Sequence, residues 1–457
     1  MNFTKIHLKN FRGFQENSEI QLAPLTFLVG PNSSGKSSIF DALLLLAQSG
    51  FAPSAPTARI PNWQGSLVDL GSYKDTVYRH EVGRDISIVV DVSLDATDHG
   101  NILRMPSSAR AARFEFRLTC SGRADPIGRL SELLVTDLKS DQVISFSYPE
   151  NDPNRTTVTI LGKRRIRRMD SLPSAAFYFR KWIEEFVADL VARSVLPSKS
   201  SIEAALAFAT NPFFSQFSTR IQRISSGRLG PRRWYSAMSV IPSRAYRGLY
   251  DGIDPLMIEE IRRHDERIRK TETSKYKQKI GRFLKHLDIA SEVKDFKLSP
   301  YHTAINVRDN VTKVVSNLID VGYGASQVLP VIVGCLSRSK SPLLVEQPEI
   351  HLHPRAQGSI AELLCETSKH RQVMIETHSE HMINRARILV GQGKLSPDSV
   401  IINYVSRQKH GSCIEPISIL KNGDFSKPWP EGFFDERYND TMLLLDIKNK
   451  RSKKKSL

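Results

Sequence analysis

The sequence predicts an α/β fold to which an antiparallel β lobe and an inserted α-helical domain are added. Two apolar runs, Leu25–Val29 and Leu343–Val345, are typical of buried parallel strands, and a glycine turn and a helical pattern follow the first. Between these runs, residues 86–160 contain several segments that alternate apolar and polar residues, as half-exposed antiparallel strands do. The pattern then becomes helical over residues 171–290.

The glycine turn after the first strand matches the phosphate-binding pattern G-x-x-x-x-G-K-[ST]. Glycines let the backbone curl around an anion, and the free N–H groups at the start of the following helix point at it. Lysine in this pattern reaches the β- and γ-phosphates, and the next hydroxyl binds Mg²⁺. The sequence therefore predicts an ATP and Mg²⁺ site. Its residues are Gly30, Pro31, Asn32, Ser33, Ser34, Gly35, Lys36, Ser37 and Ser38.

Composition limits the remaining possibilities. A chain of 457 residues is too long for one simple core, so two domains are expected. No apolar run approaches the roughly 20 residues that cross a bilayer, residues 1–7 lack the apolar core of a signal peptide, and four scattered cysteines form no metal or disulfide pattern. These features favour a cytoplasmic protein. The net charge of +17 indicates an acidic partner such as DNA, unless the basic surface has no specific partner.

The segment before the phosphate loop carries a family resemblance. Asn10-Phe11-Arg12-Gly13-Phe14, followed by the phosphate loop, resembles the opening of the SMC/RecF/OLD branch of ABC-type ATPases. The resemblance implies a split ABC-type P-loop head, and it places Asn10 and Arg12 beside the nucleotide. The implied domains are the first part of the head (1–100), the β lobe (101–170), the helical insertion (171–299), the second part of the head (300–420) and a C-terminal segment (421–457).

Two basic groups lie in the middle of the chain. Lys163–Arg168 and Arg232-Arg233-Trp234-Tyr235 are each interpreted either as a solvated helix face or as a nucleic-acid contact. The second group combines guanidinium groups with aromatic rings, which suits stacked bases.

A second glycine turn, from Asp320 to Ala325, precedes a helix for which Ser326 is the expected N-cap. It resembles the OLD-like variant of the ABC signature motif. The resemblance implies that Gly324 and Ser326 contact the γ-phosphate bound by another subunit, and hence that ATP joins two heads in a homodimer.

The late apolar strand ends in acidic residues, where ligands bind in open α/β sheets. It resembles the Walker B segment, so Glu346 is expected to hold Mg²⁺ through water. The catalytic base would be the next residue, but Gln347 cannot accept a proton. Either Glu349 replaces it, or hydrolysis is slow. His378 resembles the switch histidine that bonds the γ-phosphate.

Taken together, these motifs predict an ATP-binding, slowly hydrolysing subunit of a bacterial DNA-related complex. The chain resembles the ATPase subunits of anti-phage defence systems such as Septu, which act with an effector nuclease. Since neither a Toprim-like acidic cluster nor an HNH-like histidine arrangement is present, the nuclease is expected on a separate chain. The alternatives are a RecF-like DNA-repair clamp without a nuclease and a nucleotide-sensing regulator that never touches DNA. Residues 427–436 resemble a short C-terminal segment of some bacterial OLD-like ATPases, with no role that the residues indicate.

Overall fold

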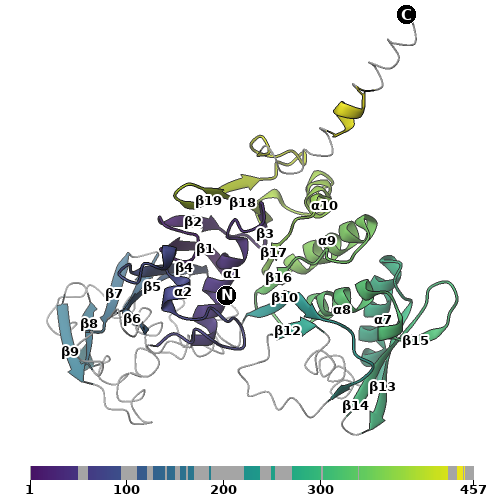
Figure 1. The fold of residues 1–457 in the computed structure, drawn as a ribbon, viewed down its shortest axis with the longest axis horizontal. Helices are drawn as coiled ribbons and strands as arrows, with labels where there is room; N and C mark the ends of the chain where they lie inside the picture. Colours follow the sequence, from purple (N-terminus) through teal and green to yellow (C-terminus); the bar gives the residue numbers. More distant parts are fainter. Residues whose placement is uncertain are drawn as a thin grey trace, which may run out of the picture.

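The computed structural model describes residues 2–49, 60–93, 111–120, 127–138, 141–149, 155–160, 163–168, 185–186, 221–236, 249–252, 270–299, 302–337, 339–430, 440–445 and 447. Within these residues, two large sheets enclose the helix that follows the phosphate loop, and further helices cover the outer face of one sheet (Figure 1).

A mainly parallel sheet of seven strands, in the order β12-β10-β16-β17-β3-β18-β19, forms the centre of the molecule. Only β19 runs antiparallel to its neighbour. Every residue of β3, β16 and β17 is buried, because other layers cover both faces of these strands. The strands are β3 (Leu25–Val29), β10 (Gln222–Leu229), β12 (Leu249–Gly252), β16 (Leu343–Glu346), β17 (Val373–Glu376), β18 (Val400–Gln408) and β19 (Gly411–Ser418).

The β lobe is an antiparallel sheet of eight strands. Its inner face is apolar and includes Phe114 and Phe116 of strand β5. In spatial order the strands are β2 (Ser18–Gln21), β1 (Asn2–Lys9), β4 (Ile86–Ser93), β5 (Ala111–Cys120), β6 (Gly128–Asp137), β7 (Gln142–Ser147), β8 (Arg155–Ile160) and β9 (Lys163–Arg168).

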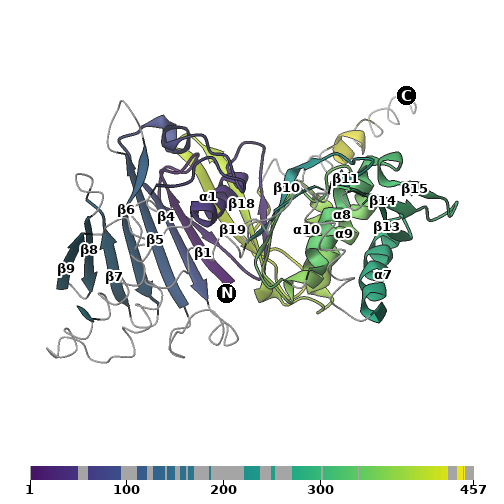
Figure 2. The ribbon, with the colours of Figure 1, turned by 90° about the horizontal axis from the view of Figure 1, so that it is seen from below.

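Helix α1 (Lys36–Ser49) lies between the two sheets (Figure 2). Phe40 and Leu43 belong to one core cluster with Phe116 of the β lobe and with Leu344 and Met374 of the central sheet. A helix that is covered on all sides must be apolar all round, which explains the unbroken run of leucines in α1.

The outer face of the central sheet is covered by α8 (Tyr323–Leu336), α9 (Pro354–Ser368) and α10 (Glu380–Gly391), which share a second core cluster with the strands. Helix α7 (Lys270–His286) packs beside α8. A four-stranded sheet completes this side. Its strands are β11 (Tyr235–Ser236), β13 (Glu292–Ser299), β14 (His302–Arg308) and β15 (Val315–Asn317). The short helix α2 (Tyr73–Thr76) lies elsewhere, next to the segment that carries Arg12.

The α/β class with its antiparallel β lobe is confirmed, but two stretches differ from the prediction. Gln222–Leu229, expected within the helical insertion, is strand β10, because it pairs in parallel with β16. The basic run Lys163–Arg168 is an edge strand rather than a helix face. Of the region predicted to be helical, residues 171–184, 187–220, 237–248 and 253–269 lie outside the described residues.

Candidate functional site

A cavity of about 720 Å³ opens where the phosphate loop meets the carboxyl ends of the central strands. The phosphate loop lines it, together with residues from five other parts of the chain. The lining residues are Arg12, Gly13, Asn32, Ser33, Gly35, Lys36, Ser37, Ser38, Tyr78, Arg79, Gln347, Glu376, His378, Arg407, Gln408, Lys409, Gly411 and Ser412.

The phosphate loop has the backbone that its sequence predicts. Ser33 and Gly35 have φ angles of 58° and 107°, so the chain turns back on itself around the cavity. The Nζ of Lys36 donates to the carbonyls of Gly30 (3.0 Å) and Pro31 (2.7 Å). Carbonyl oxygens thus bind the ammonium group, as phosphate oxygens would, and burial lowers the pKa of Lys36. Within the loop, Ser34 is fully buried.

Gly30 shows why this loop tolerates no side chain at its first position. Its φ is 142°, and a Cβ atom there would lie 2.0 Å from the carbonyl oxygen of Val405 in β18. The loop therefore rests directly on the backbone of the neighbouring strand.

Of the two residues expected beside the nucleotide, only Arg12 lines the cavity. Its guanidinium forms an ion pair of 2.7 Å with Asp41 of α1, and burial raises the pKa of Asp41 to about 6. Asn10 instead donates its side-chain amide to the carbonyl of Asp85, which fixes the turn that presents Arg12. Both residues have positive φ angles, 53° and 48°.

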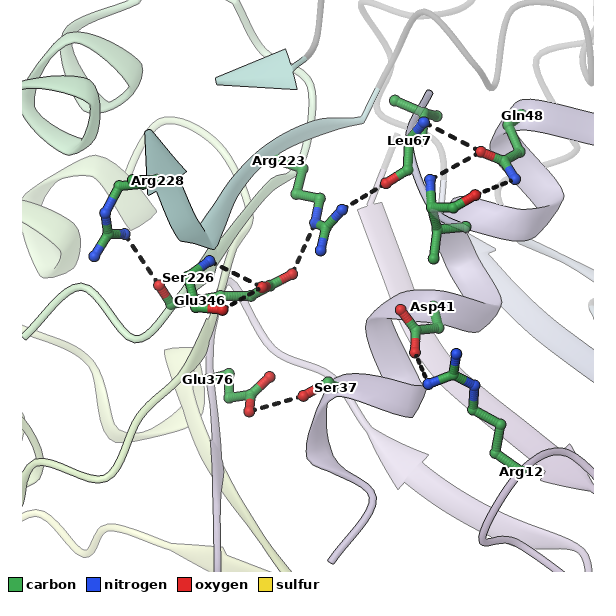
Figure 3. Close-up of polar contacts among 11 residues, drawn as sticks. Arg12, Ser37, Asp41, Gln48, Leu67, Arg223, Ser226, Arg228, Glu346 and Glu376 are labelled. Carbon is green, nitrogen blue, oxygen red and sulfur yellow. Dashed lines mark hydrogen bonds and ion pairs between the residues drawn. The ribbon is translucent and has the colours of Figure 1, made fainter. Parts of the chain in front are cut away.

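Glu346, the predicted Mg²⁺ ligand, is not among the residues that line the cavity. Its carboxylate accepts from Arg223 Nε (2.7 Å) and from the backbone and hydroxyl of Ser226 (3.0 and 3.2 Å), as Figure 3 shows. Sequence patterns gave no sign of these partners, because both belong to β10, which was expected to be helical. Arg223 engages Oε1 of Glu346 and Ser226 engages Oε2, so both oxygens that a cation would need are occupied.

Gln347 lies at the cavity with a φ of 42°, and its N–H donates to the carbonyl of Glu376. Arg228 donates to the carbonyl of Gln347 at 2.9 Å and so fixes this strained backbone.

Glu349 lies behind His378 rather than at the cavity. Its Oε1 accepts from the backbone N–H of His378 at 2.7 Å, and burial raises the pKa of this carboxyl. His378 itself lines the cavity, and burial lowers its pKa, so at neutral pH it is a neutral imidazole that donates one N–H.

Glu376, at the end of β17, is a site residue that the sequence prediction missed. Its Oε1 accepts from the hydroxyl of Ser37 at 3.0 Å, and it lines the cavity. Burial raises its pKa to about 7. The available signal was its place at the end of a buried parallel strand two residues before His378.

The second glycine turn differs from the prediction. The N-cap of α8 is Gly322, whereas Ser326 is fully buried within the first turns and donates its hydroxyl to the carbonyl of Tyr323. Gly324 packs against the carbonyl of His351, 2.7 Å from where a Cβ would stand. The exposed residues at this helix start are Gly322 and Tyr323, and neither lines the cavity.

The turn that joins β18 and β19 forms a further wall that was not predicted. Arg407, Lys409 and Ser412 line the cavity. The N–H of Ser412 donates to the carbonyl of Gly13 at 2.7 Å, which holds the turn against the segment that carries Arg12.

The site suits a nucleotide with a bound cation better than a metal ion held by protein alone. Ser37 offers a hydroxyl oxygen, which is the hard donor that Mg²⁺ prefers. Among the described residues, no group of three or more His, Cys, Asp or Glu side chains is placed to hold a metal ion. Within the same residues, no helix combines the length and apolar character needed to cross a membrane.

The sequence profile of the AAA ATPase domain matches residues 1–159 and 238–383. The chain belongs to the AAA ATPase domain family. The match includes the phosphate loop, Glu376 and His378 of this AAA ATPase, but not the β18–β19 turn. Residues 395–444 match a different family, described as a protein of unknown function (DUF3696), so that segment supplies one wall of the cavity.

This AAA ATPase is similar over its length to the OLD nuclease of Thermus scotoductus, at 23% identity over 466 residues that cover 97% of the chain and 73% of the relative. Among solved structures it is similar to the Smc head bound to the C-terminal winged-helix domain of ScpA, with a TM-score of 0.47, 14% identity, and 92% and 99% of the two chains covered. The SMC head domain of Thermotoga maritima gives 0.37 at 13% identity, with 91% and 99% covered.

Proposed function

We propose that this AAA ATPase binds Mg²⁺–ATP, hydrolyses it slowly and serves as the nucleotide-driven subunit of a bacterial anti-phage complex. The observation that carries the ATP assignment is the cavity in which Lys36, Ser37 and His378 meet beside the phosphate loop. The loop N–H groups and Lys36 bind the β- and γ-phosphates, His378 donates to the γ-phosphate, and a Mg²⁺ ion supplies charge neutralisation when it is bound.

Slow turnover is supported by the groups near the γ-phosphate. Gln347 is held at the cavity but is an amide, which accepts no proton. Glu349 is engaged by the backbone of His378 and does not line the cavity. Neither Gln347 nor Glu349 is therefore placed as a base for the attacking water.

The test of ATP binding is Lys36→Ala. The variant loses the ammonium group that pairs with the phosphate charge, and ATP affinity in a binding titration should fall by about 100-fold or more. Lys394→Ala, at an exposed position, is the charge-matched control. Equal ATP affinity of Lys36→Ala and the control would refute the nucleotide site.

Nuclease action is assigned to a separate protein. The support is that, among the described residues, no group of three or more His, Cys, Asp or Glu side chains is placed to hold a metal ion. The purified chain should leave DNA intact in Mg²⁺ or Mn²⁺. Capture from the native host followed by mass spectrometry should identify the nuclease. Cleavage by the chain alone that survives removal of contaminants would show that the nuclease is intrinsic.

DNA binding is supported by charge. The chain carries a net charge of +17, and the edge strand β9 presents Lys163 and Arg164 to solvent. In the other basic group, Arg233 is paired with Asp320, which leaves Trp234 as its exposed aromatic face. DNA affinity should fall linearly on a log–log plot against salt. The double variant Lys163→Glu/Arg164→Glu should reduce the slope of DNA affinity against salt. Glutamate keeps the edge strand charged, so the edge still resists pairing with another strand. An affinity that is independent of salt would exclude this contact.

The heads are proposed to join through ATP. The exposed start of α8 presents backbone N–H groups outside its own cavity, so a second head is needed to bring it to a γ-phosphate.

A further inference from the structure

We infer that Glu376, together with Ser37, binds the divalent cation of the nucleotide, in the place that the sequence pattern assigns to Glu346. This inference rests on the proposed ATP site. It concerns which carboxylate of the protein faces the cation.

Glu376 faces the phosphate loop from the adjacent strand. Strand β17 pairs directly with β3, the strand that leads into the loop, so the end of β17 lies next to the loop. The carboxylate Oε1 accepts from Ser37 at 3.0 Å (Figure 3). The residue is only 4% exposed, and Oε2 is buried without a hydrogen-bond partner among the described residues. A buried carboxylate oxygen in this state is costly unless a ligand occupies it.

The distance between the two oxygens fits one cation. Mg²⁺ holds its ligands at about 2.0–2.1 Å in octahedral geometry, so two neighbouring ligand oxygens lie about 2.9–3.0 Å apart. The hydroxyl of Ser37 and the carboxylate of Glu376 are separated by 3.0 Å. When the Ser37 hydroxyl hydrogen turns away from Glu376, Ser37 Oγ and Glu376 Oε1 are close enough together to face one ion.

Glu346 is committed elsewhere. Besides its bonds to Arg223 and Ser226, its backbone carbonyl accepts from Arg228 at 3.1 Å. Arg223 also donates to the carbonyl of Leu67, so the pair links β16 to the loop that follows α1. Binding of a cation by Glu346 would leave the half-buried guanidinium of Arg223 without its carboxylate, which is a large cost. Glu346 therefore acts as a structural anion.

The experiment compares ATP binding with and without cation. Affinity for a non-hydrolysable ATP analogue is measured in EDTA and in Mn²⁺, and Mn²⁺ bound in the ternary complex is counted by electron paramagnetic resonance. The variants are Glu376→Gln and Glu346→Gln, which both preserve side-chain volume. We expect Glu376→Gln to bind the analogue in EDTA as tightly as the wild type does. The increase in affinity on adding Mn²⁺ should be at least tenfold smaller in this variant than in the wild type. Glu346→Gln should keep that gain.

Two further variants keep the test decisive. Glu376→Asp retains a carboxylate and should recover part of the Mn²⁺ gain. If Glu346→Gln does not fold, Arg223→Gln combined with Glu346→Gln replaces it, because the double change removes both charges. If Mn²⁺ raises the analogue affinity of Glu376→Gln as much as that of the wild type, the inference is overturned. This holds even if the variant has lost ATP turnover. Failure of the wild-type chain to bind the analogue would instead refute the proposed ATP site.

Discussion

We propose that Gln347 sets the rate of hydrolysis. Its φ of 42° and the hydrogen bond from Arg228 to its carbonyl hold it at the cavity, so a carboxylate at this position would inherit the same placement. Glu349, by contrast, has its carboxylate behind the backbone of His378. The amide of Gln347 and the carboxylate of Glu349 therefore have different roles, although the two residues are close in the chain.

Gln347→Glu should raise the ATPase rate by about tenfold or more, because the new carboxylate accepts a proton from the attacking water. Steady-state phosphate release checks this. Glu349→Gln is the matched change, and it should alter the rate less than about twofold, since a glutamine oxygen still accepts from His378. A wild-type rate in the first variant, or complete loss in the second, would show that Glu349 is the base.

Asp41 makes the stability of the free protein depend on pH. Burial raises its pKa from 3.8 to about 6. The folded protein therefore holds this proton more tightly than the unfolded chain, so the contribution of Asp41 to stability is highest at low pH and falls as pH rises from about 4 to about 6. The difference corresponds to on the order of 3 kcal/mol. Asp41→Asn should remove this part of the pH dependence in urea unfolding curves. An unchanged difference between pH 4 and pH 6 would contradict the pKa assignment.

At the scale of elements, the β18–β19 turn is part of the nucleotide site although it lies outside the AAA ATPase match. It touches the cavity wall through Ser412 and adds the cations Arg407 and Lys409. Strand β18 pairs with β3, the strand that leads into the phosphate loop, so the turn is anchored next to that loop.

Replacing Arg407 and Lys409 together by alanine should weaken ATP binding by about tenfold, because two cations are withdrawn from a site for a polyanion. Isothermal titration at low salt measures the effect, which should shrink as salt is raised. Lys421→Ala, an exposed lysine of the same segment, is the control. Equal affinities in both variants would show that the turn only supports the loop.

At the scale of the whole molecule, the layers separate the two anion-binding helix starts. Helix α1 begins at the cavity between the sheets, whereas α8 lies on the outer face of the central sheet, so one head does not place both on the same phosphate (Figure 1). In the proposed dimer, two-fold pairing of heads would bring each α8 start to the partner's cavity.

Gly322→Glu should abolish ATP-driven association while each head still binds ATP. The position is open, with nothing within 4 Å of an added Cβ, and the new carboxylate repels the γ-phosphate. Gly322→Ala is the neutral control.

A mixture of Lys36→Ala and Gly322→Glu chains, each inactive alone, should recover hydrolysis. In a mixed dimer, the intact phosphate loop of one chain meets the intact α8 start of the other, so one composite site is intact. Mixed dimers that form without hydrolysis would exclude the shared site.

The sequence by itself determined the α/β class, the phosphate loop and the strands that lead to it, because these depend on local spacing and on apolar runs that only buried strands need. It also identified Gln347 and His378 at the cavity. Only the tertiary structure decided which acid faces Ser37, since Glu346 and Glu376 both end buried parallel strands and differ in partners that lie more than 100 residues away in sequence, Arg223 and Ser226 for one and Ser37 for the other. Likewise, burial of Ser326 and the approach of Ser412 to Gly13 follow from packing between distant segments, and no local pattern encodes such contacts.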